Sequence, residues 1–162
     1  MKVNDIISTY CLIPHPEGGF YREVYRSKET ISGTLAPDNF PSGRSYSTSI
    51  YFLLSKKDVS KLHMIRSDET WHFYAGGPLT IIEFNEHGKM EQHILGQDVI
   101  AGQLFQYTVI AGRWFGCYTD SEYSFVGCTV APGFDFMDFK MADKTQLLRS
   151  YPDNKSIIER LS

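Results

Sequence analysis

The sequence predicts a mainly β protein whose strands form a sandwich or a barrel. Short runs rich in β-branched and aromatic residues recur along the middle of the chain, and turn residues separate them. Aromatic residues make up 14% of the 162 residues, with ten Tyr and eleven Phe, which favours pleated sheet surfaces over long helices. Apolar residues at helical spacing occur only near the two ends of the chain. We therefore expect a β-rich domain with short terminal helices.

The N-terminal part is expected to be a short helix, then a turn and a strand. Asn4 is a candidate N-cap residue for this helix. Four apolar side chains follow it at helical spacing: Ile6, Ile7, Tyr10 and Cys11. Prolines and glycines over 14–19 end the helix, and side chains alternate as in a strand over 20–27. The segment 31–43, with two prolines and two glycines, predicts a loop.

The rest of the chain predicts a series of short strands and then two short helices. The strand-like runs are 47–54, 61–65, 70–74, 79–84, 91–94, 103–109, 114–118 and 124–130. The residues 85–88 read Asn-Glu-His-Gly, which is typical of a hairpin turn. Near the C-terminus, apolar residues recur at helical spacing on both sides of Pro152, and this predicts two short helices.

Length and charge limit the domain organisation and the partners. A chain of 162 residues fits a single domain over 1–162, which can bury roughly 70% of the surface of its unfolded form. The net charge of −3, with no run of one sign, argues against a nucleic-acid partner. No apolar stretch approaches the roughly 20 residues of a membrane span, and the start has no signal-peptide core. Three cysteines without CxxC spacing fit reduced thiols, so we expect a cytoplasmic protein.

The segment 63–76, HMIRSDETWHFYAG, combines histidines and a carboxylate on two predicted neighbouring strands. His63, Glu69 and Gly76 follow the spacing of the first motif of the cupin superfamily, which this segment resembles. That motif reads His, any residue, His, three or four residues, Glu, six residues, Gly. Ile65 stands at the position of its second His.

The second cupin motif resembles the segment 102–115, but Phe115 stands where that motif has its His. Two of the four usual metal ligands of the superfamily are therefore replaced by apolar side chains. A stable transition-metal site normally has at least three protein ligands, so His63 and Glu69 are too few. We expect no metal and no other cofactor. Strand alternation directs His72 away from the barrel interior, and only a bulge would turn it inward.

Four longer segments resemble the cupin-5 family, also known as domain of unknown function 985. They are PHPEGGFYREVYRS at 14–27, SIYFLL at 49–54, SDETWHFYAGGPL at 67–79 and CTVAPGFDFMDF at 128–139. The resemblance extends from Ile6 to about Met141. It implies a double-stranded β-helix, also called a jelly-roll barrel, that forms a homodimer. It does not imply an activity, because none is established for the family.

The candidate catalytic residues are His63, Glu69 and Tyr74. A His beside a carboxylate in an aromatic pocket can serve as a general base, since its ordinary pKa of about 6.5 is close to neutral pH. A Tyr would supply the acid, with Tyr51 and Tyr118 as alternatives to Tyr74. The candidate ligand-binding residues are Glu17, Arg22, Trp71, His72, Trp114 and Phe115.

The leading functional hypothesis is a small-molecule-binding cupin that acts as a metal-independent isomerase or epimerase on a sugar or nucleotide sugar. It relies on a similarity to the metal-free dTDP-sugar 3,5-epimerases at the level of the fold. The first alternative is a noncatalytic module that holds a metabolite in an apolar pocket with a few polar anchors. The second alternative is a metal-dependent cupin whose atypical site is completed by His72, Glu17 or water.

Overall fold

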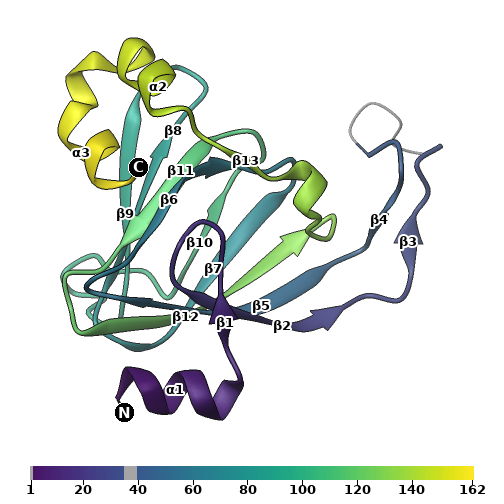
Figure 1. Ribbon diagram of the computed structural model, residues 1–162, viewed down its shortest axis with the longest axis horizontal. Helices are drawn as coiled ribbons and strands as arrows, with labels where there is room; N and C mark the ends of the chain where they lie inside the picture. Colours follow the sequence, from purple (N-terminus) through teal and green to yellow (C-terminus); the bar gives the residue numbers. More distant parts are fainter. Residues whose placement is uncertain (1, 35–39) are drawn as a thin grey trace.

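The structure is a computed structural model that describes residues 2–34 and 40–162. Two β-sheets face each other, and every pair of neighbouring strands in them is antiparallel (Figure 1). The six-stranded sheet has the order β1 (Ile13–Pro14), β2 (Phe20–Arg26), β5 (Thr48–Ser55), β12 (Tyr123–Ala131), β7 (Asp68–Gly76) and β10 (Gln106–Val109). The five-stranded sheet has the order β13 (Lys140–Met141), β6 (Val59–Met64), β11 (Trp114–Tyr118), β8 (Leu79–Phe84) and β9 (Met90–Leu95). This confirms the prediction of a mainly β fold.

A third, two-stranded sheet extends away from these two. It pairs β3 (Thr30–Ile31) with β4 (Arg44–Ser45), and Figure 1 shows it as an arm beyond β2 and β5. The predicted loop 31–43 lies mostly between these two strands. Its residues 35–39 lie outside the described part of the chain.

Short helices lie near the two ends of the chain, as predicted. They are α1 (Val3–Tyr10), α2 (Lys144–Ser150) and α3 (Lys155–Arg160), with 3-10 turns η1 (Phe136–Asp138) and η2 (Pro152–Asn154). The prediction that Asn4 caps α1 is wrong, because the helix begins after Lys2. The carboxylate of Asp5 accepts a hydrogen bond from the Lys2 backbone N–H at 3.3 Å, which satisfies that donor at the N-terminus. No helix among the described residues is long and apolar enough to cross a membrane.

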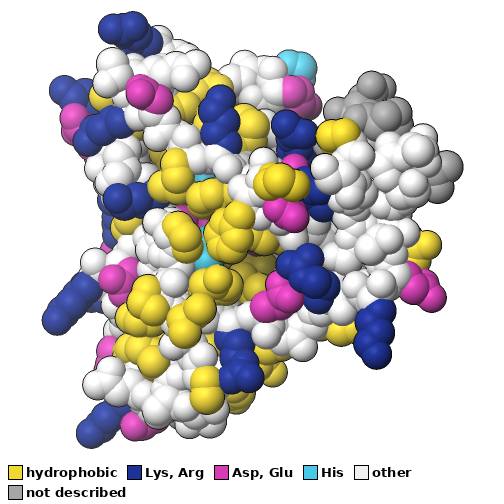
Figure 2. All heavy atoms as spheres, turned by 45° about the vertical axis from the view of Figure 1, so that its right-hand side comes forward, with side chains coloured by type: hydrophobic (Ala, Val, Ile, Leu, Met, Phe, Trp, Pro, Cys, Tyr) yellow, Lys and Arg dark blue, Asp and Glu magenta, His cyan; other side chains and the backbone are white. Residues whose placement is uncertain are grey.

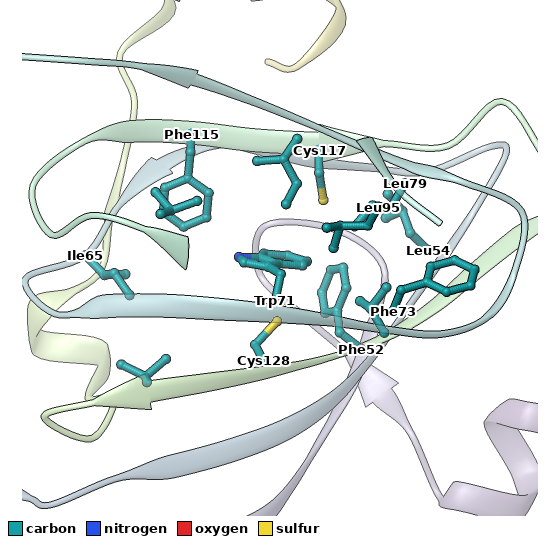
Figure 3. Packing of buried hydrophobic residues seen from close by; sticks show 14 residues of the cluster. Phe52, Leu54, Ile65, Trp71, Phe73, Leu79, Leu95, Phe115, Cys117 and Cys128 are labelled. Carbon is teal, nitrogen blue, oxygen red and sulfur yellow. The ribbon is translucent and has the colours of Figure 1, made fainter. Parts of the chain in front are cut away.

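The space between the two sheets is filled by large apolar side chains. Trp71, Phe52 and Phe115 are among the largest of them, and each is at most 1% exposed. Figure 3 shows Trp71 at the centre of this core, with side chains of both sheets around it. The core closes the middle of the barrel and leaves room for a cavity near one end.

The outer faces of both sheets are also covered. Leu147 of α2 and Ile158 of α3 pack against Ile82 and Phe84 of β8, on the outside of the five-stranded sheet. Ile6 of α1 packs against Leu53 on the outside of the six-stranded sheet. Strand β8 is therefore buried on both faces, which explains its nearly continuous apolar sequence.

Gly18 fixes the path of the turn between β1 and β2. Its φ is +114°, and a Cβ atom built on it would lie 2.1 Å from the carbonyl oxygen of Val59. Only glycine fits such a close approach in this backbone conformation. The turn brings the preceding residue, Glu17, to the mouth of the barrel.

We expect Gly18→Ala to lower the free energy of unfolding by about 3 kcal/mol or more, because it adds both backbone strain and a steric clash. Gly102→Ala is the control, since Gly102 has a φ of +81° but a Cβ atom added to it would have no neighbour within 4 Å. Strain alone should cost about 1 kcal/mol there. Urea denaturation measures both values, and equal losses would contradict the close approach at Gly18.

Candidate functional site

A cavity of about 260 Å³ lies near the end of the barrel where the β1–β2 turn meets β5, β6 and β7. Figure 2 shows histidine side chains inside a hollow that hydrophobic side chains surround. Much of the wall is apolar or aromatic, and it comprises Tyr21, Ile50, Phe52, Ile65, Trp71, Val130, Phe134 and Phe136. A few buried polar groups also belong to this wall. An apolar lining with a few polar groups is the usual composition of a small-molecule site.

His63 on β6 is fixed in orientation and is 2% exposed. Its Nδ1 lies 2.7 Å from the backbone carbonyl oxygen of Lys61. Since a carbonyl can only accept, Nδ1 carries the hydrogen and Nε2 is left with a free lone pair. The ring packs against Phe115 with 4.1 Å between centroids. Burial lowers the pKa of His63, so the imidazole is neutral at pH 7.

Glu17 lies directly in front of this lone pair. Its Oε2 is 3.3 Å from His63 Nε2, and its Oε1 accepts a hydrogen bond from the Ser60 hydroxyl at 2.8 Å. The side chain is buried, and this burial raises the pKa of the Glu17 carboxyl. Oε2 of Glu17 therefore faces the lone pair of His63 Nε2, and burial favours the protonated form of this carboxyl group.

His15 completes the surroundings of Glu17. Its Nδ1 accepts the backbone N–H of Glu17 at 3.3 Å and lies 3.4 Å from Glu17 Oε2. Burial lowers the pKa of His15 as well. The lone pair of His15 Nδ1 is already satisfied by the Glu17 N–H, so the lone pair of His63 Nε2 is the one that a proton on the Glu17 carboxyl group would satisfy. A proton shared between Glu17 and His63 can move over a short distance.

Glu69 on β7 is the second buried carboxyl group of the cavity. Burial first, and the charge of Glu17 second, raise its pKa from 4.5 to about 7, while His63 acts in the opposite direction. The Cys128 thiol and the Trp71 indole also favour the charged carboxylate. The indole Nε1 is buried without a well-formed hydrogen bond, so its contact with Glu69 is an electrostatic one of imperfect geometry.

Arg26 and Glu23 of β2 form one side of the cavity rim. The Arg26 guanidinium donates to both carboxylate oxygens of Glu23, at 3.0 and 2.7 Å. It also donates to the Ser45 hydroxyl and to the carbonyl oxygen of Phe134, each at 3.1 Å. The rim segment that follows β12 is thereby tied to β2 and to the β3–β4 arm.

The structure brings together four of the residues that the sequence indicated. His63, Glu69, Glu17 and Trp71 all line the cavity. Phe115 lies behind the ring of His63 and pairs with it across β11 and β6, so it supports the imidazole from the core.

Arg22 and Trp114 do not reach the cavity, which corrects the expected ligand-binding set. Arg22 is exposed, and its guanidinium donates to the backbone carbonyl of Tyr10 at 3.3 Å. Trp114 packs against the C-terminal helices and lies under the Lys140 ammonium group. Side chains along a strand point alternately to the two faces of the sheet, and both residues are on the face away from the interior.

Tyr74 and His72 likewise lie on the outer face of β7. Tyr74 is the extra residue of a β-bulge, and its ring lies over Gly127 and beside Tyr51 and Phe125. His72 Nε2 lies 3.1 Å from the Thr129 hydroxyl. The bulge begins after Phe73, so it leaves the predicted outward direction of His72 unchanged. The two alternative acids are outside the cavity too: Tyr51 packs beside α1, and Tyr118 lies under Arg160.

Several residues of the rim were not among the candidates that the sequence indicated. Tyr21, Arg26, Phe134, Asp135 and Phe136 all line the cavity. In the sequence, these residues belong to two patterns: the alternation of side chains along β2 and the closely spaced aromatic residues after Pro132. Neither pattern shows that the run folds back over the barrel end, where η1 is fixed by a buried ion pair between Arg44 and Asp138 at 2.6 Å.

The donor atoms of the cavity do not match a transition-metal site. Ile65 lines the wall where a ligand would be needed, and Phe115 presents a ring. Within the described residues, no three His, Cys, Asp or Glu ligand atoms of this cavity lie within 4.8 Å of one another. The residues therefore do not fit the three-His, one-carboxylate pattern of the superfamily.

A second polar cluster lies on β8 and β9, around Glu83. The ligand atoms of Glu83, Glu91 and His93 lie within 4.8 Å of one another. Glu83 is fully buried, and its Oε1 is contacted by the Tyr107 hydroxyl, by His93 Nε2 at 3.2 Å and by Arg113 Nη1 at 3.3 Å. Since Arg113 already supplies the countercharge, this cluster is accounted for as a buried ion-pair network.

The profile of one protein family, described as Cupin superfamily (DUF985), matches residues 4–142. The chain belongs to this family. Among solved structures, a Shewanella oneidensis protein, SO0799, is 38% identical with a TM-score of 0.90, covering 100% of this chain and 98% of that one. The uncharacterized protein YML079W of Saccharomyces cerevisiae is 28% identical over 85% of this chain and 73% of its own length.

More distant cupins share only the fold. Oxalate decarboxylase from Bacillus subtilis is 14% identical, with a TM-score of 0.57 over 92% of this chain and 36% of that chain. The predicted cupin jelly-roll fold is thus confirmed, and so is the predicted family. The activity of this cupin has to be argued from its own cavity.

Glu69 should make the stability of this cupin fall as the pH rises. Its folded-state pKa of about 7 lies above the unfolded value of 4.5. The stabilisation is therefore fully present below pH 4.5 and is lost as the pH rises to about 7. The shift corresponds to about 3 kcal/mol. Urea unfolding between pH 4.5 and 8 measures this change.

The comparison with Glu69→Gln isolates this effect, because the amide cannot ionise. His63 acts with the opposite sign: its pKa is lowered, so its contribution is present above pH 6.5 and is lost as the pH falls. The difference between wild type and Glu69→Gln reports Glu69 together with its coupling to His63, because the charge of Glu69 raises the pKa of that imidazole. An unchanged pH dependence in Glu69→Gln would show that Glu69 does not have a raised pKa.

Proposed function

We propose that this cupin binds a small polar metabolite in the cavity and catalyses a metal-independent proton transfer on it, as isomerases and epimerases do. The observation that carries the proposal is the pairing of His63 Nε2 with Glu17 Oε2 at 3.3 Å. A neutral imidazole with a fixed tautomer and a carboxyl group whose pKa is raised by burial form a base and an acid at one point of the wall. Glu69, which titrates near pH 7, supplies a second proton-accepting group.

The size of the cavity narrows the proposed substrate. A cavity of about 150 Å³ is known to hold benzene, so about 260 Å³ admits one substituted ring. A sugar ring fits this volume, whereas the remainder of a nucleotide sugar would lie outside. A carbon next to a carbonyl group in such a ring is the position from which a neutral imidazole removes a proton.

A noncatalytic binding module is the alternative, because the same wall would also hold a ligand by its apolar area and a few polar anchors. The two proposals differ in one observable. Only an enzyme of the proposed kind exchanges a carbon-bound hydrogen of its ligand with solvent.

His63→Asn should slow proton exchange by a factor of roughly 10² to 10⁴, because the amide can still donate to the Lys61 carbonyl but offers no basic nitrogen at the Nε2 position. The measurement is deuterium incorporation from D₂O into a panel of ring-forming ketoses, aldoses and amino sugars, followed by NMR. His72→Asn is the matched control, since His72 lies outside the cavity. It should exchange at the wild-type rate.

Two other results would overturn the enzymatic proposal. One is ligand binding by the wild type without any exchange, which would identify a binding module. The other is equal exchange in His63→Asn and wild type, which would remove His63 from the reaction. Loss of exchange in both variants would point to a structural effect rather than a catalytic one.

We also propose that this cupin forms a homodimer through the free edge of β2. Within residues 2–34 and 40–162, β1 pairs with Phe20 and Tyr21 and no strand covers the rest of this edge of β2, where Val24 and Tyr25 are 46% and 55% exposed. An apolar, unpaired strand edge is usually covered by another chain. Light scattering at micromolar concentration should give about twice the 18.5 kDa chain mass. A mass of one chain would contradict the proposal.

A cytoplasmic location is part of the same proposal. Cys11, Cys117 and Cys128 are all free thiols, which supports a reducing compartment.

A further inference from the structure

We propose that the ligand of this cavity carries a positively charged nitrogen, as a ring amine does, and that the cavity rejects anions. The proposal rests on the proposed function only in taking the cavity as the ligand site. It concerns the class of the ligand and not the reaction.

The first observation is the imbalance of charged side chains in the lining. Four carboxyl groups line the cavity: Glu17, Glu23, Glu69 and Asp135. Arg26 is the one Lys or Arg among the described lining residues, and its guanidinium is already bound to Glu23, Ser45 and Phe134. A phosphate or carboxylate would therefore meet acidic groups and no free cation.

The second observation is the aromatic character of the wall. Tyr21, Phe52, Trp71, Phe134 and Phe136 line the same space as the two buried glutamates. The faces of aromatic rings attract cations, and cages of such rings recognise ammonium ions. A carboxylate within an aromatic wall suits both parts of an alkylammonium ion. The carboxylate binds the charged nitrogen, and the rings pack against the alkyl part.

The third observation is a buried carboxyl group with weak hydrogen-bond donors. Glu69 is 7% exposed, and the groups of the described residues that donate toward it are the indole of Trp71 and the thiol of Cys128. Its contact with the Trp71 Nε1 hydrogen is imperfect. An ammonium group of the ligand would offer this carboxylate a full charge-assisted hydrogen bond.

The titratable groups around Glu69 determine how binding depends on pH. They are Glu17 and His15 before β2, His63 of β6, Cys117 of β11 and Cys128 of β12. Both thiols stay uncharged because burial raises their pKa, and both imidazoles stay neutral because burial lowers theirs. A cation that binds to Glu69 therefore expels the proton of a carboxyl group. Affinity should rise as the pH rises, by up to about tenfold per unit below pH 7.

Three probes of the same shape test the proposal: cyclohexylammonium, cyclohexanol and cyclohexanecarboxylate. Calorimetry and NMR titration of the full chain at pH 7.5 give their dissociation constants and the resonances that shift. We expect the ammonium ion to bind at least about tenfold more tightly than the alcohol, and the carboxylate to bind most weakly. Calorimetry at pH 6 in buffers of different ionisation enthalpy should show release of close to one proton on binding, since a carboxyl group with a pKa of about 7 is mostly protonated there.

Glu69→Gln should remove most of the preference for the ammonium ion over the alcohol, while the affinity for cyclohexanol stays within about threefold. Glu122→Gln is the control, since this exposed carboxylate lies outside the cavity and its loss should change neither affinity. The pH dependence of the wild type provides a test that needs no variant.

Each outcome decides the proposal. Equal or tighter binding of the alcohol or the carboxylate at the cavity would overturn the cationic class and leave the cavity as a ligand site. Binding of none of the probes near Trp71 would overturn this inference, whereas the proposed function stands or falls with the deuterium-exchange experiment. Preferential ammonium binding that persists in Glu69→Gln would also contradict it, because the charge would then act elsewhere.

Discussion

The carboxyl group of Glu17 imposes the constraint on which the cavity end of the barrel depends. A carboxyl group that is buried in this way must have every oxygen satisfied. Ser60 binds one oxygen at 2.8 Å, and the two imidazoles face the other. The glycine turn that follows Glu17 holds this residue in place. Gly18 lies so close to the backbone of β6 that no side chain would fit there. The local fold and the acid–base pair are therefore one arrangement.

The same burial explains why proton chemistry fits this cavity better than metal chemistry. In cupins that hold a metal, charged ligands and neutral imidazoles share a cation. Here Ile65 and Phe115 stand in place of two ligands, and the remaining histidines face the carboxyl group of Glu17 at 3.3 and 3.4 Å. Burial in this wall raises the pKa of both glutamates and lowers the pKa of both histidines, so that their values approach one another and small changes in the bound ligand redistribute protons.

Much of the fold followed from the sequence because its strands have strong local signals. The turn residues and the period-two pattern located β8 and β11 at their observed bounds, and β5, β7 and β12 within two residues. The two-residue strands β1, β3, β4 and β13 were missed, since such short pairs are set by tertiary contacts and not by their own sequence.

The candidate site was predictable only where a motif or alternation constrained it. His63, Glu69 and Trp71 were found because their spacing on two strands put them on the inner face. Tyr74 was misplaced because it was chosen by analogy with the epimerases, whereas the alternation of β7 puts it, like His72, on the outer face. The rim residues around Phe134 could not be found from sequence, since the return of that segment over the barrel depends on the distant Arg44–Asp138 pair.

The filled core of the barrel determines how a ligand enters and leaves the cavity. Trp71, Phe52 and Phe115 occupy the middle of the barrel at close to full burial, so the described residues leave the cavity closed on its inner side. A molecule that enters past the aromatic rim must leave by the same opening. A bound molecule must therefore leave before the next one can enter, because both use the same opening.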